Sequence, residues 1–257
     1  MVPSKVAVAG GKGGVGKTLL SVALAHALDV PLVDCDVTEP DVPAYLPLEV
    51  KRELFDVEQP VPVRTEDCKG CGECERRCPW DALDDPMACD GCGICGAACP
   101  VDAIKFESER LGAVVEAVCE RLGLTVRYPD AEPWAPELAS VVVNSLADLD
   151  AFVADCPAGL GCPVIATLTS VEAAVLVGTP DEAALRDLER AERLATELDV
   201  PYVKVLNMAE GHVGKGDFDV VIPKLPALHE AAQNRDPEGI VRELKPYVET
   251  VLEAIRA

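Results

Sequence analysis

Short apolar runs alternate with helix-favouring segments along most of the chain. Residues 6–9 form an apolar run typical of a strand, and residues 19–28 are good helix formers. A second strand is predicted in residues 31–36, ending at Asp34. Later strands are predicted at residues 150–155, 173–178, 202–207 and 219–222, with a helix at 180–198 between two of them. This alternation predicts an α/β fold with a doubly wound, mainly parallel sheet.

The alternation stops between residues 64 and 107, where a 21-residue repeat is rich in cysteine and glycine. Each copy has the spacing C-x-x-C-x-x-C-x-x-x-C-P, with its cysteines at Cys68, Cys71, Cys74 and Cys78, then at Cys89, Cys92, Cys95 and Cys99. Residues 59–64 before it read as a loop. We therefore predict a small inserted domain at 64–107, between a first part at 1–63 and a second part at 108–257. Within 108–145 the pattern is weak, with a helix expected at 113–122 and a turn at 134–136.

Thiolates are soft ligands, and this cysteine spacing is the bacterial ferredoxin arrangement. Two copies predict a ferredoxin-like (α+β) domain with two 4Fe-4S clusters. In this arrangement the fourth cysteine of each run binds the other cluster. The predicted ligand sets are therefore Cys68, Cys71, Cys74 and Cys99 for one cluster, and Cys78, Cys89, Cys92 and Cys95 for the other. Structural zinc bound by the C-x-x-C pairs is the alternative.

Charge and composition limit the remaining possibilities. With 23 Lys and Arg against 45 Asp and Glu, the net charge is −22, which disfavours a nucleic-acid-binding surface. A salt-rich habitat is another possible source of this acidity. No apolar run reaches the roughly 18–20 residues that span a bilayer, and residues 1–5 are too short for a signal peptide. We expect a cytoplasmic protein. Eight of its twelve cysteines fall in two identically spaced clusters, which favours metal binding over disulfides.

A glycine loop follows the first predicted strand and precedes the first predicted helix. In Gly11-x-x-x-x-Gly16-Lys17-Thr18, successive backbone N–H groups can converge on a phosphate. Lys17 is expected to reach the β- and γ-phosphates, and Thr18 to hold Mg²⁺. A glycine-rich turn without ligand is the alternative, and the flanking strand and helix disfavour it.

The full string of residues 11–18, Gly-Lys-Gly-Gly-Val-Gly-Lys-Thr, resembles the deviant P-loop of the MinD/ParA/nitrogenase-iron-protein family of dimeric ATPases. The resemblance implies ATP and Mg²⁺ as ligands and a homodimer in which Lys12 crosses to the phosphates of the partner subunit. The nucleotide contacts it implies in this loop are Gly11, Lys12, Gly13, Gly14, Val15, Gly16, Lys17 and Thr18.

Further motifs of this family stand in the expected order. Asp34-Cys35-Asp36 resembles the first switch, in which Asp36 contacts the attacking water or the Mg²⁺ shell. Residues 155–159, Asp-Cys-Pro-Ala-Gly, resemble the Walker B motif and second switch, which implies that Asp155 binds Mg²⁺ through water and Gly159 senses the γ-phosphate. Asn207 matches the adenine-reading asparagine, and Pro223 lies in the segment that borders the base. The expected catalytic residues are Lys12, Lys17 and Asp36.

Four cysteines and three histidines lie outside these motifs. Cys162 is seven residues after Asp155, the offset at which the nitrogenase iron protein binds a 4Fe-4S cluster shared across its dimer. A second bridging ligand is not recognisable, with Cys119 and Cys156 as candidates. A buried small side chain is the alternative for all of them and for Cys35. The histidines, His26, His212 and His229, read as ordinary surface residues.

Together these features predict a homodimeric, ATP-hydrolysing iron–sulfur protein. Its nucleotide switch would be coupled to electron transfer through the two clusters toward a partner metalloenzyme. The alternative is an assembly or carrier ATPase that delivers a cluster or metal to an apo-enzyme. ParA-like positioning of cargo is disfavoured because no basic DNA patch is visible. The predicted C-terminal helix has four acids and three bases within 238–256, whereas the cell-division members have a basic one that binds membrane, so we expect no membrane role.

Overall fold

The computed structural model describes residues 3–37, 39–85, 88–89, 91–131, 139–210 and 218–256. Within them, nine strands form one sheet in the order β3-β4-β5-β2-β6-β1-β7-β8-β9. The part from β5 to β9 is parallel, as predicted. Its strands are β1 (Lys5–Ala9), β2 (Leu32–Asp34), β5 (Leu124–Ala131), β6 (Phe152–Asp155), β7 (Ala173–Gly178), β8 (Tyr202–Ala209) and β9 (Val220–Pro223).

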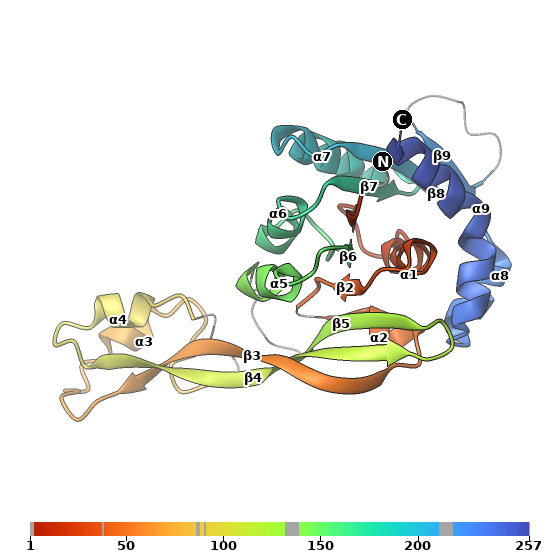
Figure 1. The fold of residues 1–257 in the computed structure, drawn as a ribbon. Helices are drawn as coiled ribbons and strands as arrows, with labels where there is room; N and C mark the ends of the chain where they lie inside the picture. The colour runs from red at the N-terminus through yellow and green to blue at the C-terminus, as the bar shows by residue number, and fades with distance from the viewer. Residues whose placement is uncertain are drawn as a thin grey trace.

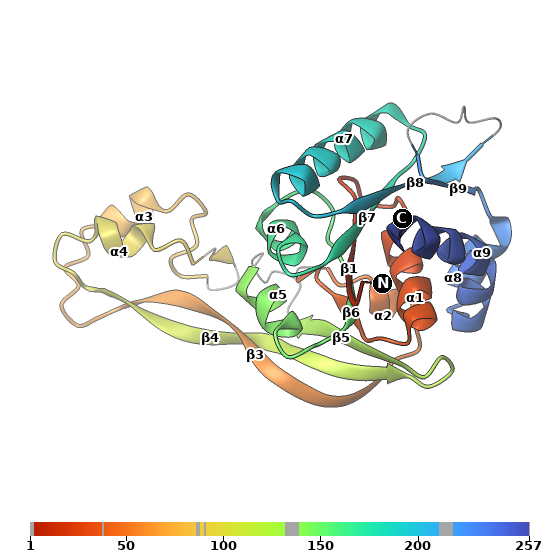
Figure 2. The same ribbon diagram turned by 45° about the horizontal axis from the view of Figure 1, so that its top comes forward.

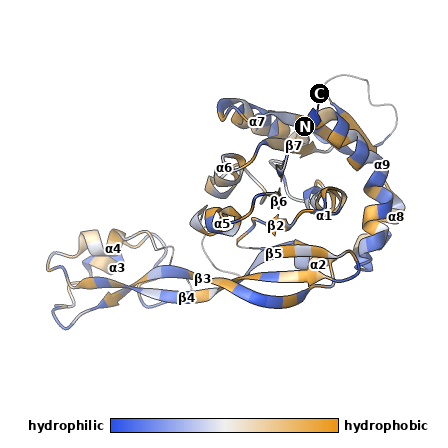
Figure 3. Cartoon of the chain, in the orientation of Figure 1, coloured by the Kyte–Doolittle hydropathy of each residue, from blue (hydrophilic) through white to orange (hydrophobic). Residues whose placement is uncertain are grey.

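Helices cover both faces of the parallel part (Figure 1). One layer holds α1 (Lys17–Leu28), α8 (Pro226–Gln233) and α9 (Pro237–Arg256), and the other holds α5 (Ala139–Leu146), α6 (Cys162–Leu168) and α7 (Glu182–Glu197). The central strands are apolar on both faces and are coloured hydrophobic in Figure 3, as two covering layers require. The predicted doubly wound fold is thereby confirmed, including the C-terminal helix. None of the helices in these described ranges is long and apolar enough to span a bilayer.

The first strand ends where the glycine loop begins, and the loop leads directly into α1. Asp34 ends β2 and Asp155 ends β6, and the two residues are register partners in neighbouring parallel strands. The carboxyl ends of β1, β2 and β6 therefore meet at one edge of the sheet. Ligands bind at this edge in open α/β sheets.

A long antiparallel arm extends from the edge of this sheet, and the sequence does not predict it. It consists of β3 (Glu49–Arg64) and β4 (Ile104–Cys119), which pair along their length, with β4 also antiparallel to β5. Figures 1 and 2 show the arm reaching well beyond the helical layers. The loop expected at 59–64 is therefore wrong, because these residues belong to β3. The helix expected at 113–122 is also wrong, because residues 113–119 belong to β4. The turn expected at 134–136 lies outside the described residues.

The cysteine repeat occupies the chain between β3 and β4, at the far end of the arm (Figure 2). It contains two short helices at matching repeat positions, α3 (Glu73–Arg77) and α4 (Ile94–Ala98). A small separate core holds them together, formed by Cys74, Cys95 and Ile104 with Leu83 and Cys99 packed against it. With so few apolar residues, this core is small for an independent unit, so added metal ligation would contribute to its stability.

Candidate functional site: a phosphate loop and two cysteine cavities

The glycine loop wraps the N-terminus of α1. Gly16 caps this helix with φ 92°, in the left-handed region that glycine adopts without strain. A Cβ atom there would collide with the side-chain nitrogen of Asn207. As a glycine, this N-cap has no side chain to accept from the helix, and the first turn holds no acidic residue. Its first N–H groups and positive dipole end are therefore directed at the loop, where an anion would bind.

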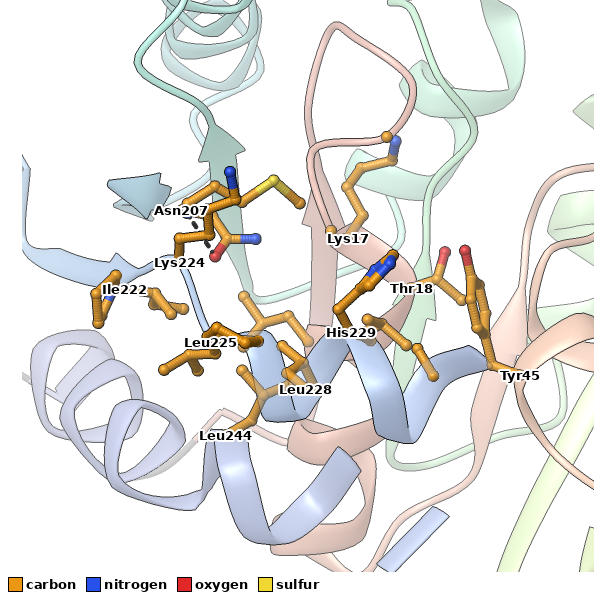
Figure 4. Close-up of a pocket in the computed structure, with 18 of the residues that line it drawn as sticks. Lys17, Thr18, Tyr45, Asn207, Ile222, Lys224, Leu225, Leu228, His229 and Leu244 are labelled. Atoms are coloured by element: carbon orange, nitrogen blue, oxygen red, sulfur yellow. Dashed lines mark hydrogen bonds between the residues drawn. The ribbon is translucent and has the colours of Figure 1, made fainter. Parts of the chain in front are cut away.

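A cavity of about 640 Å³ opens beside this loop (Figure 4). Gly14, Gly16, Lys17 and Thr18 line one end of it, and Asn207 and Pro223 line another part. The structure thus brings together residues that are about two hundred positions apart in the sequence. The side-chain amide of Asn207 donates to the carbonyl of Val15 at 2.8 Å, so it also fixes the loop.

Several further residues that line this cavity are not predicted from the sequence. Asp41 and Tyr45 reach it from the start and end of α2 (Val42–Tyr45), and His229 reaches it from α8. His229 is therefore at the cavity wall, although its sequence context suggests an ordinary surface residue. The position of α2 just after Asp36 is the one feature that could have pointed to Asp41 and Tyr45. His26 is an exposed residue of α1, and His212 lies outside the described residues.

Two buried carboxylates lie behind the loop. Asp34 accepts the backbone N–H groups of Val42 at 2.9 Å and Asp36 at 3.1 Å. Asp155 accepts the hydroxyl of Ser21 at 3.0 Å. Burial, followed by the charge of Asp155, raises the pKa of Asp34 well above its ordinary value. Burial also raises the pKa of Asp155 to about 6, opposed by Thr18 and Lys17. Two adjacent buried carboxylates without a cation cost free energy, and a divalent cation would compensate for it.

The two expected switch segments are each held by a hydrogen bond of the backbone. Asp36, two residues after the end of β2, donates its N–H to Asp34 at 3.1 Å, and its carboxylate accepts the N–H of Glu39 at 3.0 Å. Gly159 donates its N–H to the carbonyl of Gly11 at 3.1 Å, which joins the second switch to the glycine loop. Neither Asp36 nor Gly159 lines the 640 Å³ cavity in this conformation.

The two lysines of the loop differ in their surroundings. Lys17 is 8% exposed, and its ammonium lies 3.4 Å from the carbonyl of Lys12 inside the loop. Lys12 does not line the cavity, and its ammonium forms an ion pair with Asp181 at 2.9 Å. Asp181 is the N-cap of α7 and accepts the N–H of Ala184. Lys12 is thus the one loop lysine that the structure holds outside the cavity.

The eight repeat cysteines line two cavities, four in each. The first cavity is lined by Cys68, Cys71, Cys74 and Cys99, and the second by Cys78, Cys89, Cys92 and Cys95. Each cavity takes three cysteines from one run and the fourth from the other. These are the groups that the ferredoxin spacing predicts as ligand sets. No three His, Cys, Asp or Glu side chains in the described part of the chain converge closely enough to hold a single metal ion.

Backbone N–H groups already point at several of these sulfurs. Ala103 donates to Cys99 at 3.1 Å, Ala82 to Cys78 at 3.4 Å, and Gly91 to Cys89 at 3.4 Å. The N–H of Ala103, followed by that of Val101, lowers the pKa of Cys99 and so favours its thiolate. Four thiols around a cavity with N–H donors at the sulfurs fit the donor set of a 4Fe-4S cluster.

The four other cysteines, all within the described residues, divide into two kinds. Cys35, Cys119 and Cys156 are buried, at 1%, 0% and 2% exposure. Cys162 is exposed and begins α6. Neither candidate for a second bridging ligand, Cys119 or Cys156, is at the surface in this conformation. For the three buried residues, the role of a small packed side chain fits this placement.

Comparisons with known families give matches in both parts of the chain. Residues 1–71 match the ParA family, described as the NUBPL iron-transfer P-loop NTPase, and residues 61–84 and 83–105 each match the 4Fe-4S binding domain. Among solved structures, the septum site-determining protein MinD of Pyrococcus horikoshii with Mg-ADP is similar with a TM-score of 0.58 and 17% identity, covering 97% of this chain and 94% of that one. At that identity, the likeness shows the fold.

Curated relatives resemble most of the chain. The uncharacterized protein MJ0578 of Methanocaldococcus jannaschii is 29% identical over 216 residues, covering 79% of this chain and 77% of that protein. The iron-sulfur cluster carrier protein of Pyrococcus abyssi is 28% identical over 217 residues, with coverages of 79% and 60%. The iron-sulfur protein required for NADH dehydrogenase of Arabidopsis thaliana is 25% identical over 213 residues, with coverages of 76% and 51%. This chain therefore spans 60% or less of the length of these two iron–sulfur relatives.

Proposed function

We propose that this chain, a ParA/NUBPL-type P-loop ATPase with 4Fe-4S binding domains, is an ATP-dependent carrier that delivers iron–sulfur clusters to client apo-proteins. Electron transfer to a metalloenzyme is the first expectation from the sequence. The relatives named as cluster carriers support delivery instead. Clusters are then cargo, held in the two cysteine cavities at the end of the arm.

One structural connection carries this proposal. Tyr45 of α2 lines the 640 Å³ cavity beside the glycine loop, to which we assign the nucleotide. Strand β3 begins at Glu49, only a few residues later. The guanidinium of Arg235 donates to the carbonyls of Pro43 at 3.0 Å and Leu46 at 2.6 Å, which links α2 to the segment between α8 and α9. A change at the nucleotide site that moves α2 therefore moves the strand that leads to the cysteine cavities.

In this proposal the loop residues act on ATP. Lys17 and the N–H groups of the loop bind the phosphates, and Thr18 and Asp155 hold Mg²⁺, with Asp36 at the attacking water. Asn207 and Pro223 face the base, and Gly159 responds to the γ-phosphate. Lys12 leaves Asp181 and reaches the phosphates of a partner subunit, so hydrolysis needs a homodimer. Such γ-phosphate-dependent ordering of loops is a known type of switch.

The domain boundaries are part of the same proposal, with the ATPase domain at 1–63 and 108–257 and the insert at 64–107. Cys162, exposed at the start of α6, remains a candidate for a cluster shared across the dimer. The matching domain for the insert supports iron–sulfur binding there, and we assign one 4Fe-4S cluster to each cavity.

Cluster delivery tests the function directly. The protein, reconstituted anaerobically with ⁵⁵Fe, is mixed with an apo-protein that needs a 4Fe-4S cluster, with or without Mg-ATP. Delivery predicts that radioactive iron and sulfide move to the acceptor, and that Mg-ATP changes the rate. The Lys17→Ala variant should lose the effect of ATP but retain its clusters. If all iron stays on this chain while a ferric acceptor is reduced in an ATP-dependent way, the electron-transfer alternative replaces delivery.

A further inference from the structure

The two cysteine cavities differ in the side chains around them. The first cavity is flanked by the charged residues Arg64, Lys69 and Glu75. The second is flanked by large apolar residues, Trp80, Ile94 and Phe106, which are 54%, 41% and 42% exposed. Apolar side chains of this size that gather in one exposed place are typical of an interaction site. We call these three residues the apolar rim.

The repeat itself supplies a reference for the apolar rim. Twenty-one residues separate equivalent positions, so Trp80 corresponds to Val101 and Ile94 to Glu73. The fold of the repeat therefore accepts a half-buried valine and a glutamate at these positions. An exposed tryptophan and isoleucine in one copy are not required for folding. Their exposure calls for another explanation, such as contact with a partner.

The insert that carries the apolar rim is mainly acidic. Residues 64–107 hold five Lys and Arg and ten Asp and Glu, so 5 − 10 gives a net charge of −5. Four of the five bases are already in ion pairs with acids of the insert: Arg64 with Glu75 and Asp84, Arg76 and Arg77 with Glu73, and Lys105 with Asp102. The surplus charge available to a partner is therefore negative.

We propose that the apolar rim is the docking surface for a client protein that presents an apolar site ringed by Lys and Arg. The client then lies against the second cavity and its cysteines, Cys78, Cys89, Cys92 and Cys95, rather than against the first. An aromatic anchor within an apolar centre and a charged surround is the usual composition of an interface hot spot. Complementary charge favours this partner and repels acidic proteins. This inference rests on the proposed carrier function, because it says where the client binds.

Two other partners for the apolar rim fit the charge of the insert less well. A second copy of this chain would bring together two inserts, each of net charge −5. An anionic membrane surface would also be repelled by the net negative charge of the insert. Self-association and membrane binding would each give a distinct experimental result, so the test below includes both.

The test measures binding with the cluster-loaded, oxidised protein and ferric cytochrome c, a basic protein with an apolar haem edge, as the probe. No electron moves in this mixture, so titration calorimetry reports binding alone. The Trp80→Val variant places the residue of the other repeat copy at this position, and Ile94→Ala removes a second apolar side chain. Val50→Ala is the matched control, since Val50 is 48% exposed on β3, outside the insert.

We expect Trp80→Val and Ile94→Ala each to weaken binding by at least about tenfold, with Val50→Ala within about twofold of the unmodified chain. Hydrogen exchange should show protection by the probe in residues 91–106. Equal binding by all variants would overturn the inference. Two other outcomes would also overturn it. In the first, the unmodified chain self-associates with rising concentration, and Trp80→Val abolishes this self-association but leaves probe binding unchanged. In the second, the unmodified chain binds vesicles of phosphatidylcholine and phosphatidylglycerol, and Trp80→Val abolishes this binding but leaves probe binding unchanged.

Iron and sulfide analysis of each variant separates this inference from the proposed function. Full cluster content with unaltered probe binding in Trp80→Val would contradict the docking surface alone. Absence of clusters from the unmodified chain would contradict the proposed function, whatever the probe does. Trp80→Val with normal iron content also shows that lost binding does not come from an unfolded insert.

Discussion

The ammonium of Lys12 lies 2.9 Å from a carboxylate oxygen of Asp181, so the lysine proposed to act on a partner subunit is held within its own chain. Asp181 also accepts the hydroxyl of Thr179 at 2.6 Å and the N–H of Ala184 at 3.0 Å. Thr179, then Lys12, holds the pKa of Asp181 well below its usual range. Both partners of the ion pair are about half exposed, so it is weak enough for a phosphate to compete with it.

Asp181→Asn should make the ATP-bound dimer form at a lower protein concentration. Asparagine keeps the N-cap of α7 but removes the charge that attracts Lys12. Sedimentation velocity with a non-hydrolysable ATP analogue measures the dimerisation constant, and we expect a shift of several-fold. Asp187→Asn on the same helix is the control, since Asp187 pairs with Arg190 instead. Identical dimerisation of the two variants would contradict a holding role for Asp181.

Lys12→Ala and Lys17→Ala should each abolish ATP hydrolysis and leave the iron content unchanged. The two variants should differ in nucleotide binding, because Lys17 is buried and lines the cavity, whereas Lys12 does not line it and pairs with Asp181. We expect only Lys17→Ala to weaken binding of a fluorescent ATP analogue. Lys51→Ala, on the arm, is the control for loss of a surface lysine. Hydrolysis at the normal rate by either loop variant would refute the dimeric P-loop assignment.

Cys99→Ser should disturb the same cluster as Cys71→Ser, although Cys99 belongs to the other run of the sequence. Both residues line the first cavity, whereas Cys92 lines the second. Electron paramagnetic resonance of the reduced proteins should show one altered spectrum for Cys71→Ser and Cys99→Ser and another for Cys92→Ser. Nucleotide binding should persist in all three. Loss of ATP binding together with iron would mean that the two parts do not fold separately.

Cys162→Ser provides the matched control for these cysteine variants. Cys162 is exposed and outside both cavities, so the substitution should leave the spectra of the insert unchanged. If the ATP-bound dimer of Cys162→Ser held less iron than the ATP-bound dimer of the unmodified protein, this would indicate a shared cluster instead.

Without Mg²⁺ and nucleotide, Asp155 should make the protein less stable as the pH rises from about 4 to about 6. Its pKa is near 3.9 in an unfolded chain and raised to about 6 in the folded one, so the folded state binds more protons in this window. The stabilisation is complete below pH 4 and lost above pH 6. Two pKa units correspond to roughly 2–3 kcal/mol. Urea unfolding in EDTA should show this decline for the unmodified protein and a smaller one for Asp155→Asn; equal slopes would exclude Asp155 as its source.

The parallel part of the fold is predictable because its sequence cues are local. Buried parallel strands are continuous apolar runs, and the glycine loop fixes the junction between β1 and α1. The arm escapes prediction for a different reason. Its two strands, β3 and β4, are separated by about forty residues of intervening chain. A local sequence pattern therefore does not indicate that they pair with each other.

Particular residues of the arm explain the two wrong expectations. Pro60 and Pro62 suggest a loop, but β3 is the edge strand of the sheet, where a residue without an N–H is tolerated. Residues 113–119 have alanines and a glutamate that favour helix, yet pairing on both sides with β3 and β5 makes them a strand. Tertiary pairing outweighs intrinsic preference here.

The candidate sites divide in the same way. The loop, the switch aspartates and the cysteine runs have fixed spacings that the sequence displays. The cavity residues Asp41, Tyr45 and His229 belong to no motif of fixed spacing. They line the cavity because α2 and α8 pack around it. The sequence repeat shows that Trp80 and Val101 occupy equivalent positions with different side chains. Only the structure shows that Trp80 is exposed.

The length of the arm has a mechanical consequence. A strand of 16 residues, such as β3, spans about 50 Å at about 3.3 Å per residue. A rotation of only about 5° at the end of α2 would therefore displace the cysteine cavities by about 4 Å. Under the proposed function, the arm would act as a lever: a small rearrangement at the phosphate loop would become a displacement comparable to a side-chain contact, enough to engage or release a docked protein.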